Sequence, residues 1–434
     1  MAPDLLGSVT KLSTAASLQN LQSRAERSTC LPSSQSKAVG RIPTDDKMLP
    51  SDILYTKLRW LFTIAGLFLY VGDILTDIRL AVKYFQESHF VWTGLTLMFV
   101  LAGLLVTQVF SHTWYRDDMT DVLMNAEGKP PISGLSKGGL VFLHLFGMGI
   151  FTRYYHLLRK SFKVVWKSTH PYTVDERRDV HHKLFCMATD LSMLKLFETF
   201  LESVPQLLLQ LYIVLGHGDC TVLQYLSMAF SFFNIAWSLV DYRRCLRKSL
   251  PHIGEMPSGL PTAIYLLYKL CTITSHILSY TLLLTLSPYS AVALTVLWLL
   301  GTTWTHALQT NFCSSERLEF LYRAVIGVIL TFSFFNVKGQ DTKVAMIIYY
   351  LFYILVNITS PLLLALLKPE LSTTTFFLTV TGLISGGSVL GLVCLVLYYH
   401  FLHPMEKRRE ADEVDGPGKE TQATRRIKHF LQPG

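Results

Sequence analysis

A pentapeptide near the C-terminal end has the residue types that proteolytic chemistry requires. It consists of Asp412, Glu413, Val414, Asp415 and Gly416. Executioner caspases require aspartate before the scissile bond, and a small residue follows here. The surrounding stretch 404–434 is charged and contains Gly and Pro, which is typical of an accessible, flexible tail. The sequence therefore predicts a regulatory cytoplasmic tail that an executioner caspase cleaves after Asp415.

Cleavage there would release residues 416–434, a basic and amphipathic piece. Its apolar residues Ile427, Phe430 and Leu431 lie among arginines and a lysine. Such a piece can dock its apolar side chains in a cytoplasmic pocket and its cations on carboxylates or anionic lipid. We predict a plug whose removal shifts a closed bundle toward an open one. A passive tail, whose loss only changes trafficking, is the alternative.

Carboxylates occur inside apolar stretches, where each costs at least a few kcal/mol to insert. Asp73 and Asp77 are four residues apart and therefore share a helix face. Asp190, Glu198 and Glu202 follow one i, i+4 track, with Pro205 interrupting the regular hydrogen bonding nearby. Two interpretations are open: these groups pair with cations on neighbouring helices, or they line a hydrophilic path.

Polar residues also recur on further apolar segments, which favours a polar furrow or cavity within a bundle. The candidate cations for such a path are Arg153, Lys269 and Arg323. Cations can meet phosphate, and carboxylates can meet choline or amine groups. A furrow that replaces headgroup hydration, while acyl chains stay in the bilayer, would lower the barrier to lipid transfer without an energy source.

The composition indicates the elements that position these residues. Half of the 434 residues (50%) are hydrophobic and only 16% are charged, whereas soluble domains carry about 25% charged residues. Ten apolar runs approach or exceed the roughly 20 residues that cross a hydrocarbon core. The sequence therefore predicts an all-α polytopic membrane protein.

Basic flanks place both termini in the cytoplasm, so the number of crossings is even. Segment 139–158 is followed by many basic residues that belong on the cytoplasmic side, so it enters and leaves there. Parity then makes 318–337 a second re-entrant segment. We expect eight transmembrane helices, two re-entrant half-membrane segments and two pseudo-repeats, about 51–250 and 251–403. Residues 1–50 are expected to be a disordered cytoplasmic segment without a removable signal peptide.

Several function classes find no support in the motifs. The sequence has no GxxxxGK[ST], HExxH or GxSxG motif and no clustered Cys or His ligands. We therefore expect no enzyme, no cofactor and no metal site. The net charge of +8 is spread over short loops between apolar runs, which is typical of positive-inside loops rather than of nucleic-acid binding.

Five stretches resemble the XK-related family. They are FTRYYHLLRK (151–160), TDLSMLKLFETFLESVPQLLLQLYI (189–213), WSLVDYRRCLRKSLP (237–251), FLYRAVIGVILTFSFFNVKGQ (320–340) and the DEVDG tail. The similarity spans roughly residues 52–434 and is greatest to the branch that caspases cleave in apoptosis. Residues 1–50 have no counterpart in it.

The resemblance implies a plasma-membrane scramblase that moves phospholipids, including phosphatidylserine, between leaflets without ATP as a signal for engulfment. It implies eight spanning helices and two half-membrane segments, in agreement with the parity argument. Family intramembrane charges match the carboxylates named above, and the FTRY arginine matches Arg153. Trp92 resembles the family's outer-gate tryptophan. The implied partners are a single-span immunoglobulin-type glycoprotein or a second copy.

Two other functions fit the polar stripes. A solute transporter or channel would use the same stripes and would show saturation by its substrate without lipid flip-flop. A non-transporting escort subunit would show neither, and its loss would mislocalise a partner protein.

Overall fold

The computed structural model describes 54–120, 137–167, 174–217, 222–249, 259–310, 312–313, 315–337, 343–372 and 374–402. The described residues belong to one compact unit, Leu49–Gly434. They form helices and connecting turns without any β-strand, which confirms the predicted all-helical class. The predicted segment 1–50, the caspase pentapeptide Asp412–Gly416 and the tail residues Ile427, Phe430 and Leu431 lie outside these ranges.

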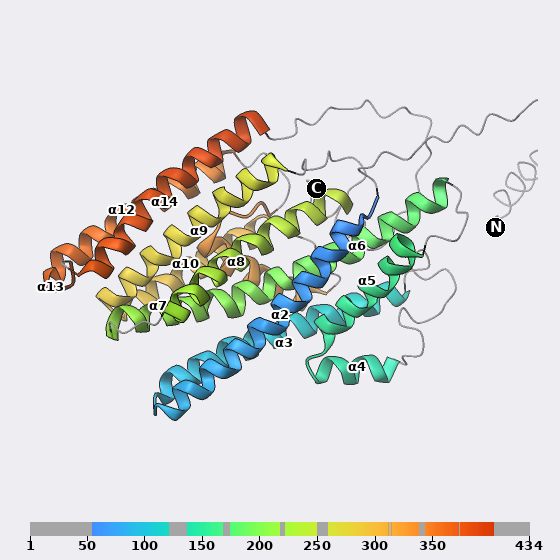
Figure 1. The fold of residues 1–434 in the computed structure, drawn as a ribbon, viewed down its shortest axis with the longest axis horizontal. Coiled ribbons are helices and arrows are strands. Elements are labelled where there is room, and N and C mark those ends of the chain that lie inside the picture. Colours follow the sequence, from blue (N-terminus) through green and yellow to red (C-terminus); the bar gives the residue numbers. More distant parts are fainter. Residues whose placement is uncertain are drawn as a thin grey trace, which may run out of the picture. The chain divides into compact units, whose positions relative to one another are not determined.

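The helices run side by side in a bundle (Figure 1). In chain order they are α2 (Lys57–Gln86), α3 (Phe90–Thr120), α4 (Lys137–Leu145), α5 (Gly149–Trp166), α6 (Val174–Glu198), α7 (Val204–His217), α8 (Val222–Ser249), α9 (Leu260–Leu286), α10 (Ser290–Ala307), α11 (Glu316–Phe332), α12 (Lys343–Leu367), α13 (Pro369–Ser372) and α14 (Thr375–Leu397). Two π-helical turns, Thr199–Ser203 and Tyr398–Leu402, continue α6 and α14.

Five of the described helices are long and apolar enough to cross a membrane. They are Lys57–Gln86, Phe90–Asp118, Glu176–Gly216, Lys343–Leu367 and Phe377–Leu402. α8 and α9, with 28 and 27 residues, are also long enough, because a rise of 1.5 Å per residue makes each about 40 Å long. The chain is therefore a multi-pass helical membrane protein.

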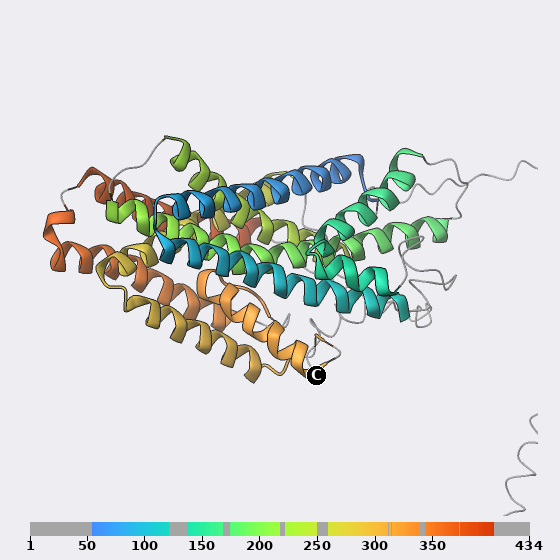
Figure 2. The same cartoon turned by 90° about the horizontal axis from the view of Figure 1, so that it is seen from below.

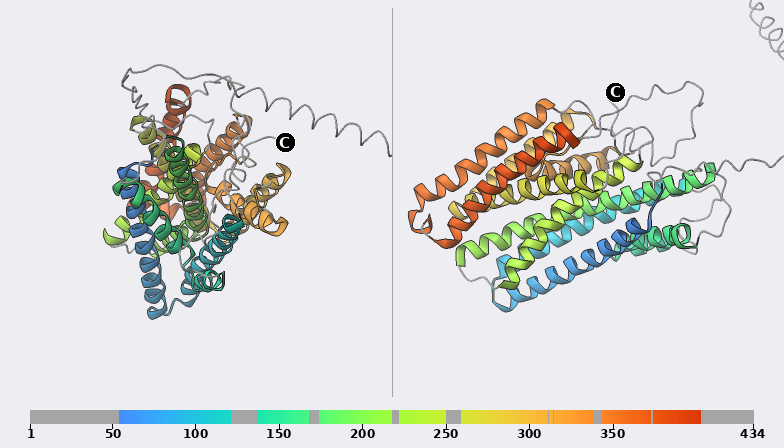
Figure 3. Two further views of the ribbon diagram at one scale, coloured as in Figure 1. Left: turned by 90° about the vertical axis from the view of Figure 1, so that its right-hand side faces the viewer. Right: turned by 45° about the horizontal axis from the view of Figure 1, so that its top comes forward.

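The C-terminal helices pack around α9. Both α12 and α14 lie against it, and α8 contacts its other side (Figure 3). α10 and α11 pair closely with one another (Figure 2). The surfaces of α12 and α14 that turn away from α9 expose Ile348, Leu362 and Val389, in agreement with lipid contact.

The apolar segment 139–158 is divided between two helices. α4 has nine residues, about 14 Å, which is too short for a hydrocarbon core of about 30 Å. The chain turns at Gly147, whose φ of 74° suits glycine because it has no Cβ. Pro205 does not end the α6–α7 helix, since the wider π-helical turn Thr199–Ser203 immediately precedes it.

Candidate functional site

Two cavities lie end to end along α2, α6–α7 and α8. The first, here called the Arg59 cavity, has a volume of about 110 Å³, and the second, the Asp77 cavity, about 260 Å³. On α2 the first reaches Leu69 and the second begins at Asp73. The two cavities are therefore separated by about one helical turn, and together they form an interrupted polar furrow.

The spacing of polar and small residues along α2 produces one wall of this furrow. These residues are Arg59, Thr63, Gly66, Tyr70, Asp73 and Asp77. Steps of four and three residues keep them on one helix face. The intervening residues Phe68, Leu75 and Ile78 are exposed and apolar. α2 thus presents its polar face to the bundle and an apolar face to lipid.

Carboxylates concentrate at the start of the Asp77 cavity, where Asp73 and Asp77 line it and Glu202 lies next to the lining residue Ser203 without lining it. Ser203 Oγ donates to Asp73 Oδ2 over 3.0 Å. Asp77 is 5% exposed and Glu202 is 3% exposed. Within the described part of the chain, Asp77 Oδ2 and Glu202 Oε1 accept no hydrogen bond. Unsatisfied buried acceptors are costly, so this cluster is suited to a hydrated or cationic group that supplies the missing donors.

A glycine on α3 makes room for Glu202. A Cβ atom at Gly103 would lie 2.8 Å from Glu202 Oε2 and 3.0 Å from its Cβ. Glu202 belongs to the π-helical turn and is buried, as is Glu198 four residues before it. The sequence identified both carboxylates but not the glycine that admits one of them.

Lys195 lies at the interruption between the two cavities. It lines the Arg59 cavity, pairs with Glu198, and places its Nζ 4.5 Å from the Tyr70 ring centroid. The candidate cations did not include Lys195. Its position three residues before Glu198, in an otherwise apolar stretch, is the signal that would have identified it.

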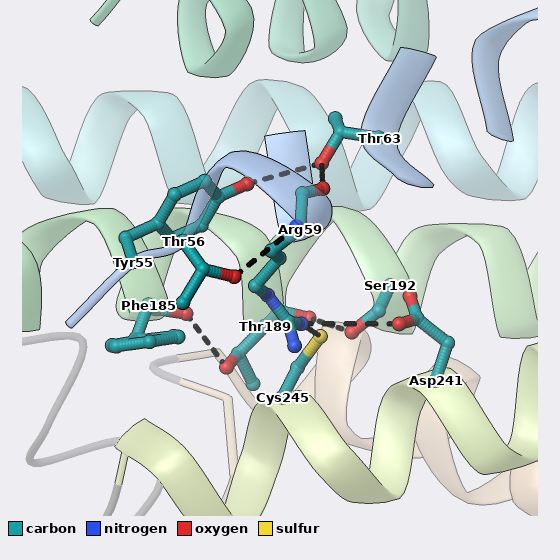
Figure 4. A network of polar contacts seen from close by, with 9 residues as sticks. All are labelled: Tyr55, Thr56, Arg59, Thr63, Phe185, Thr189, Ser192, Asp241 and Cys245. Atoms are coloured by element: carbon teal, nitrogen blue, oxygen red, sulfur yellow. Dashed lines mark hydrogen bonds and ion pairs between the residues drawn. The ribbon is translucent and has the colours of Figure 1, made fainter. Parts of the chain in front are cut away.

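A polar clasp closes the furrow at the end where α2 begins (Figure 4). Arg59 Nη2 lies 3.8 Å from Asp241 Oδ1 on α8 and also contacts the Cys245 thiol. One turn further along α2, the Phe62 and Trp237 rings lie 5.9 Å apart. These contacts join α2 to α8, so separating the two helices requires that they break.

Arg153 and Asp190 form a buried pair outside the furrow. Arg153 Nη1 lies 3.4 Å from Asp190 Oδ2, and its Nε donates to Ser111 Oγ over 3.0 Å. The guanidinium also lies 4.2 Å from the Tyr115 ring centroid. Neither charged residue lines the two cavities. The pair therefore joins α3, α5 and α6.

Replacing Arg153 with Met is expected to lower the free energy of unfolding by about 3–5 kcal/mol, because the buried carboxylate of Asp190 loses its ion pair with the guanidinium. The double variant Arg153→Met/Asp190→Leu should recover most of this loss. Thermal unfolding of the purified protein in detergent would measure both. A single variant that melts at the same temperature as the parent would show that the pair does not stabilise the bundle.

The two remaining candidate cations lie in separate places. Lys269 Nζ donates to Ser333 Oγ over 3.0 Å and to the Phe334 carbonyl over 2.9 Å, within the C-terminal helices. Arg323 bonds the Thr310 hydroxyl and carbonyl between α10 and α11. Neither lines the furrow.

Trp92 lines the Asp77 cavity at the opposite end from the clasp. Its ring stacks on His89 with centroids 4.0 Å apart, and the edge of Tyr84 lies 5.6 Å away. The structure thus brings Trp92, Asp73 and Asp77 to one cavity. Among the described residues, no group of three His, Cys, Asp or Glu side chains is arranged to hold a metal ion.

Comparison with known proteins gives consistent matches. The family model described as XK-related protein matches residues 61–404. XK-related protein 9 of Tetraodon nigroviridis is 58% identical over 379 residues, covering 87% of this chain and 99% of the relative. XK-related protein 8 of Pan troglodytes is 31% identical over 381 residues, covering 85% and 92%. The XK-related protein 8 of Tetraodon nigroviridis is 29% identical over 390 residues, covering 89% and 93%.

Proposed function

The chain belongs to the XK-related protein family, and on that premise we propose that it is a phospholipid scramblase that caspase cleavage after Asp415 switches on. The observation that carries the proposal is the interrupted polar furrow along α2, α6–α7 and α8. A path of this kind, bounded by helices whose other faces are apolar, suits a client with a polar headgroup and apolar chains.

The charges of the furrow are divided in a way that fits a zwitterionic headgroup. Arg59, Lys195 and Arg244 line the Arg59 cavity, where a phosphate would find cations. Asp73 and Asp77 line the other cavity, where a choline or amine would find carboxylates. Desolvating a charge costs several kcal/mol or more. Protein groups that replace this hydration lower the barrier in both directions, so no ATP is needed.

We propose the following topology and location. The protein lies in the plasma membrane with both termini in the cytoplasm. Eight helices cross the membrane, and α4–α5 and α11 are half-membrane segments. The basic end of α5 and the Arg59 clasp then face the cytoplasm, and Trp92 lies at the outer end of the furrow. The two halves, 51–250 and 251–403, are pseudo-repeats in this arrangement.

The tail supplies the switch in this proposal. Residues 416–434 hold the protein closed through Ile427, Phe430 and Leu431, and an executioner caspase removes them. Opening then requires that α2 and α8 separate at the Arg59 clasp. The assembly is either a homodimer or a complex with a single-span immunoglobulin-type glycoprotein.

Reconstitution tests the proposal directly. Purified protein is placed in liposomes with fluorescent phosphatidylserine or phosphatidylcholine, and dithionite access is recorded before and after caspase treatment. We expect flip-flop to rise for both lipids only after cleavage, and Asp415→Ala to stay inactive. Cleaved protein that leaves the inner leaflet protected, even with a co-expressed glycoprotein partner, would favour a solute transporter or an escort subunit.

A further inference from the structure

A second groove lies between α2 and α5, separate from the furrow. Its volume is about 540 Å³. Its lining residues are Trp60, Leu67, Phe151, Tyr155, Leu158, Arg159, Phe162, Lys163 and Lys167. No residue of this set lines the Arg59 or the Asp77 cavity. The groove is therefore a distinct feature on the outside of the bundle.

The groove is apolar along most of its length and cationic at one end. Leu67 and Phe151 line one part, and Phe162 lines the part nearer the end of α5. Arg159 and Lys163 are four residues apart and share one face of α5, and Lys167 follows directly after the last residue of that helix. All three line the groove and are here called the cationic ridge. A cationic ridge beside an apolar groove is the arrangement that an acidic headgroup with acyl chains requires.

An aromatic cluster fixes the relative position of the two helices at the cationic end. Trp60 Nε1 donates to the Leu158 carbonyl over 3.3 Å. The Trp60 ring centroid lies 5.7 Å from that of Phe162 and 5.7 Å from that of Trp166. Lys57 Nζ lies 4.8 Å from the Trp166 ring, which adds a fourth cation beside the ridge. Aromatic rings beside cationic side chains are typical of the boundary between acyl chains and headgroups.

We propose that this groove binds one anionic glycerophospholipid of the phosphatidylserine type, with an acyl chain along Leu67 and Phe151 and its headgroup on the cationic ridge. Charge complementarity selects this occupant. The chain's own tail carries Arg425, Arg426 and Lys428 and would be repelled by the ridge. A bound lipid would bridge α2 and α5 without entering the furrow. The cytoplasmic location of the ridge rests on the proposed topology.

Lipid retention by the full-length protein tests the site without any transport measurement. The protein in mild detergent is incubated with phosphatidylserine or phosphatidylcholine, exchanged into lipid-free detergent, and the retained lipids are counted by native mass spectrometry. We expect one phosphatidylserine per chain and about tenfold less phosphatidylcholine, since the cationic ridge attracts the net negative charge of the first lipid and gains nothing from the neutral headgroup of the second.

Matched variants locate the bound lipid. Arg159→Gln/Lys163→Gln should lower phosphatidylserine retention at least about fivefold, whereas Arg177→Gln/Arg178→Gln removes two exposed charges outside the groove and should leave it within about twofold. Leu67→Trp fills the groove without changing its charge and should also reduce retention.

The proposal would be overturned by equal retention of both lipids, by equal loss in the two charge variants, or by no retained lipid. Loss on Asp77→Leu/Glu202→Leu with normal retention in Arg159→Gln/Lys163→Gln would place the lipid in the furrow instead. That result would contradict the groove site and leave the scramblase proposal intact. The opposite result is also possible: if the groove variants lose lipid but the protein does not scramble lipids in liposomes, the groove site is supported and the scramblase proposal is not.

Discussion

The double variant Asp77→Leu/Glu202→Leu is expected to slow lipid flip-flop by the caspase-cleaved protein about 100-fold, which corresponds to about 2.7 kcal/mol of barrier. These side chains hold buried carboxylate oxygens that no donor satisfies in the described part of the chain. A headgroup that passes them regains part of the solvation it loses on leaving water. Leucine has no polar group to solvate the headgroup, so the barrier to lipid transfer rises.

The fold should tolerate this change. These acceptors have no hydrogen-bond partner among the described residues, so removing them leaves no donor without an acceptor. Replacing buried charged groups with apolar groups often leaves the stability of the fold unchanged or raises it. Thermal unfolding of the variant should therefore match that of the parent within a few degrees. The loss of flip-flop would then report the path rather than misfolding.

Two controls separate charge, polarity and general surface effects. Glu316→Leu/Glu370→Leu removes two carboxylates outside the furrow and should leave the dithionite rate unchanged. Asp77→Asn/Glu202→Gln keeps polar groups in place and should keep most of the activity for phosphatidylcholine. A leucine pair that scrambles at the parent rate would show that lipids take another route.

The second prediction concerns the intact protein. Arg59→Gln is expected to raise flip-flop before caspase treatment about tenfold. The substitution removes the contacts of Arg59 with Asp241 and Cys245 that join α2 to α8. Solvent screens the exposed Asp241, so this ion pair contributes little. The hydrogen bond of the charged guanidinium to the buried Cys245 thiol contributes about 1.5 kcal/mol, and its loss raises the open population about tenfold.

The solvent exposure of Asp241 makes Arg59→Gln a suitable test of gating, because the fold should stay intact in this variant. The Asp241 side chain is 36% exposed, so it stays solvated when its partner is removed and the fold is not strained by a stranded charge. Arg317→Gln, an exposed change at the start of α11, serves as the control. The dithionite assay on uncleaved protein gives the result. If Arg59→Gln and Arg317→Gln are equally silent before cleavage, the clasp is structural and does not hold the furrow closed.

Much of the fold was predictable because it follows from local pattern. Apolar runs and the small share of charged residues indicated membrane helices, and the structure confirms the all-helical class and the multi-pass character. The parity argument, with eight crossings and two half-membrane segments, stays a prediction. Hydropathy could not predict that α4 is short or that the chain turns at Gly147. An average over a window of residues has the same value whether or not the chain changes direction within it.

The carboxylates of the candidate site were also identifiable from the sequence, because charge inside an apolar stretch is costly wherever the helix packs. Their partners were not. Arg153 was considered as a phosphate ligand, whereas the structure pairs it with Asp190 and Ser111. Lys195 and Arg59, which line the furrow, were not among the candidates.

The sequence by itself determined which segments are helical and apolar and which carry buried charge, because these properties depend on residue type and on spacing along one helix. The tertiary structure alone decided which charges face one another. The distance between Arg59 and Asp241 depends on the rotation and register of two helices that lie far apart in the chain. The same holds for the furrow and for the groove between α2 and α5, since each exists only where separate helices meet.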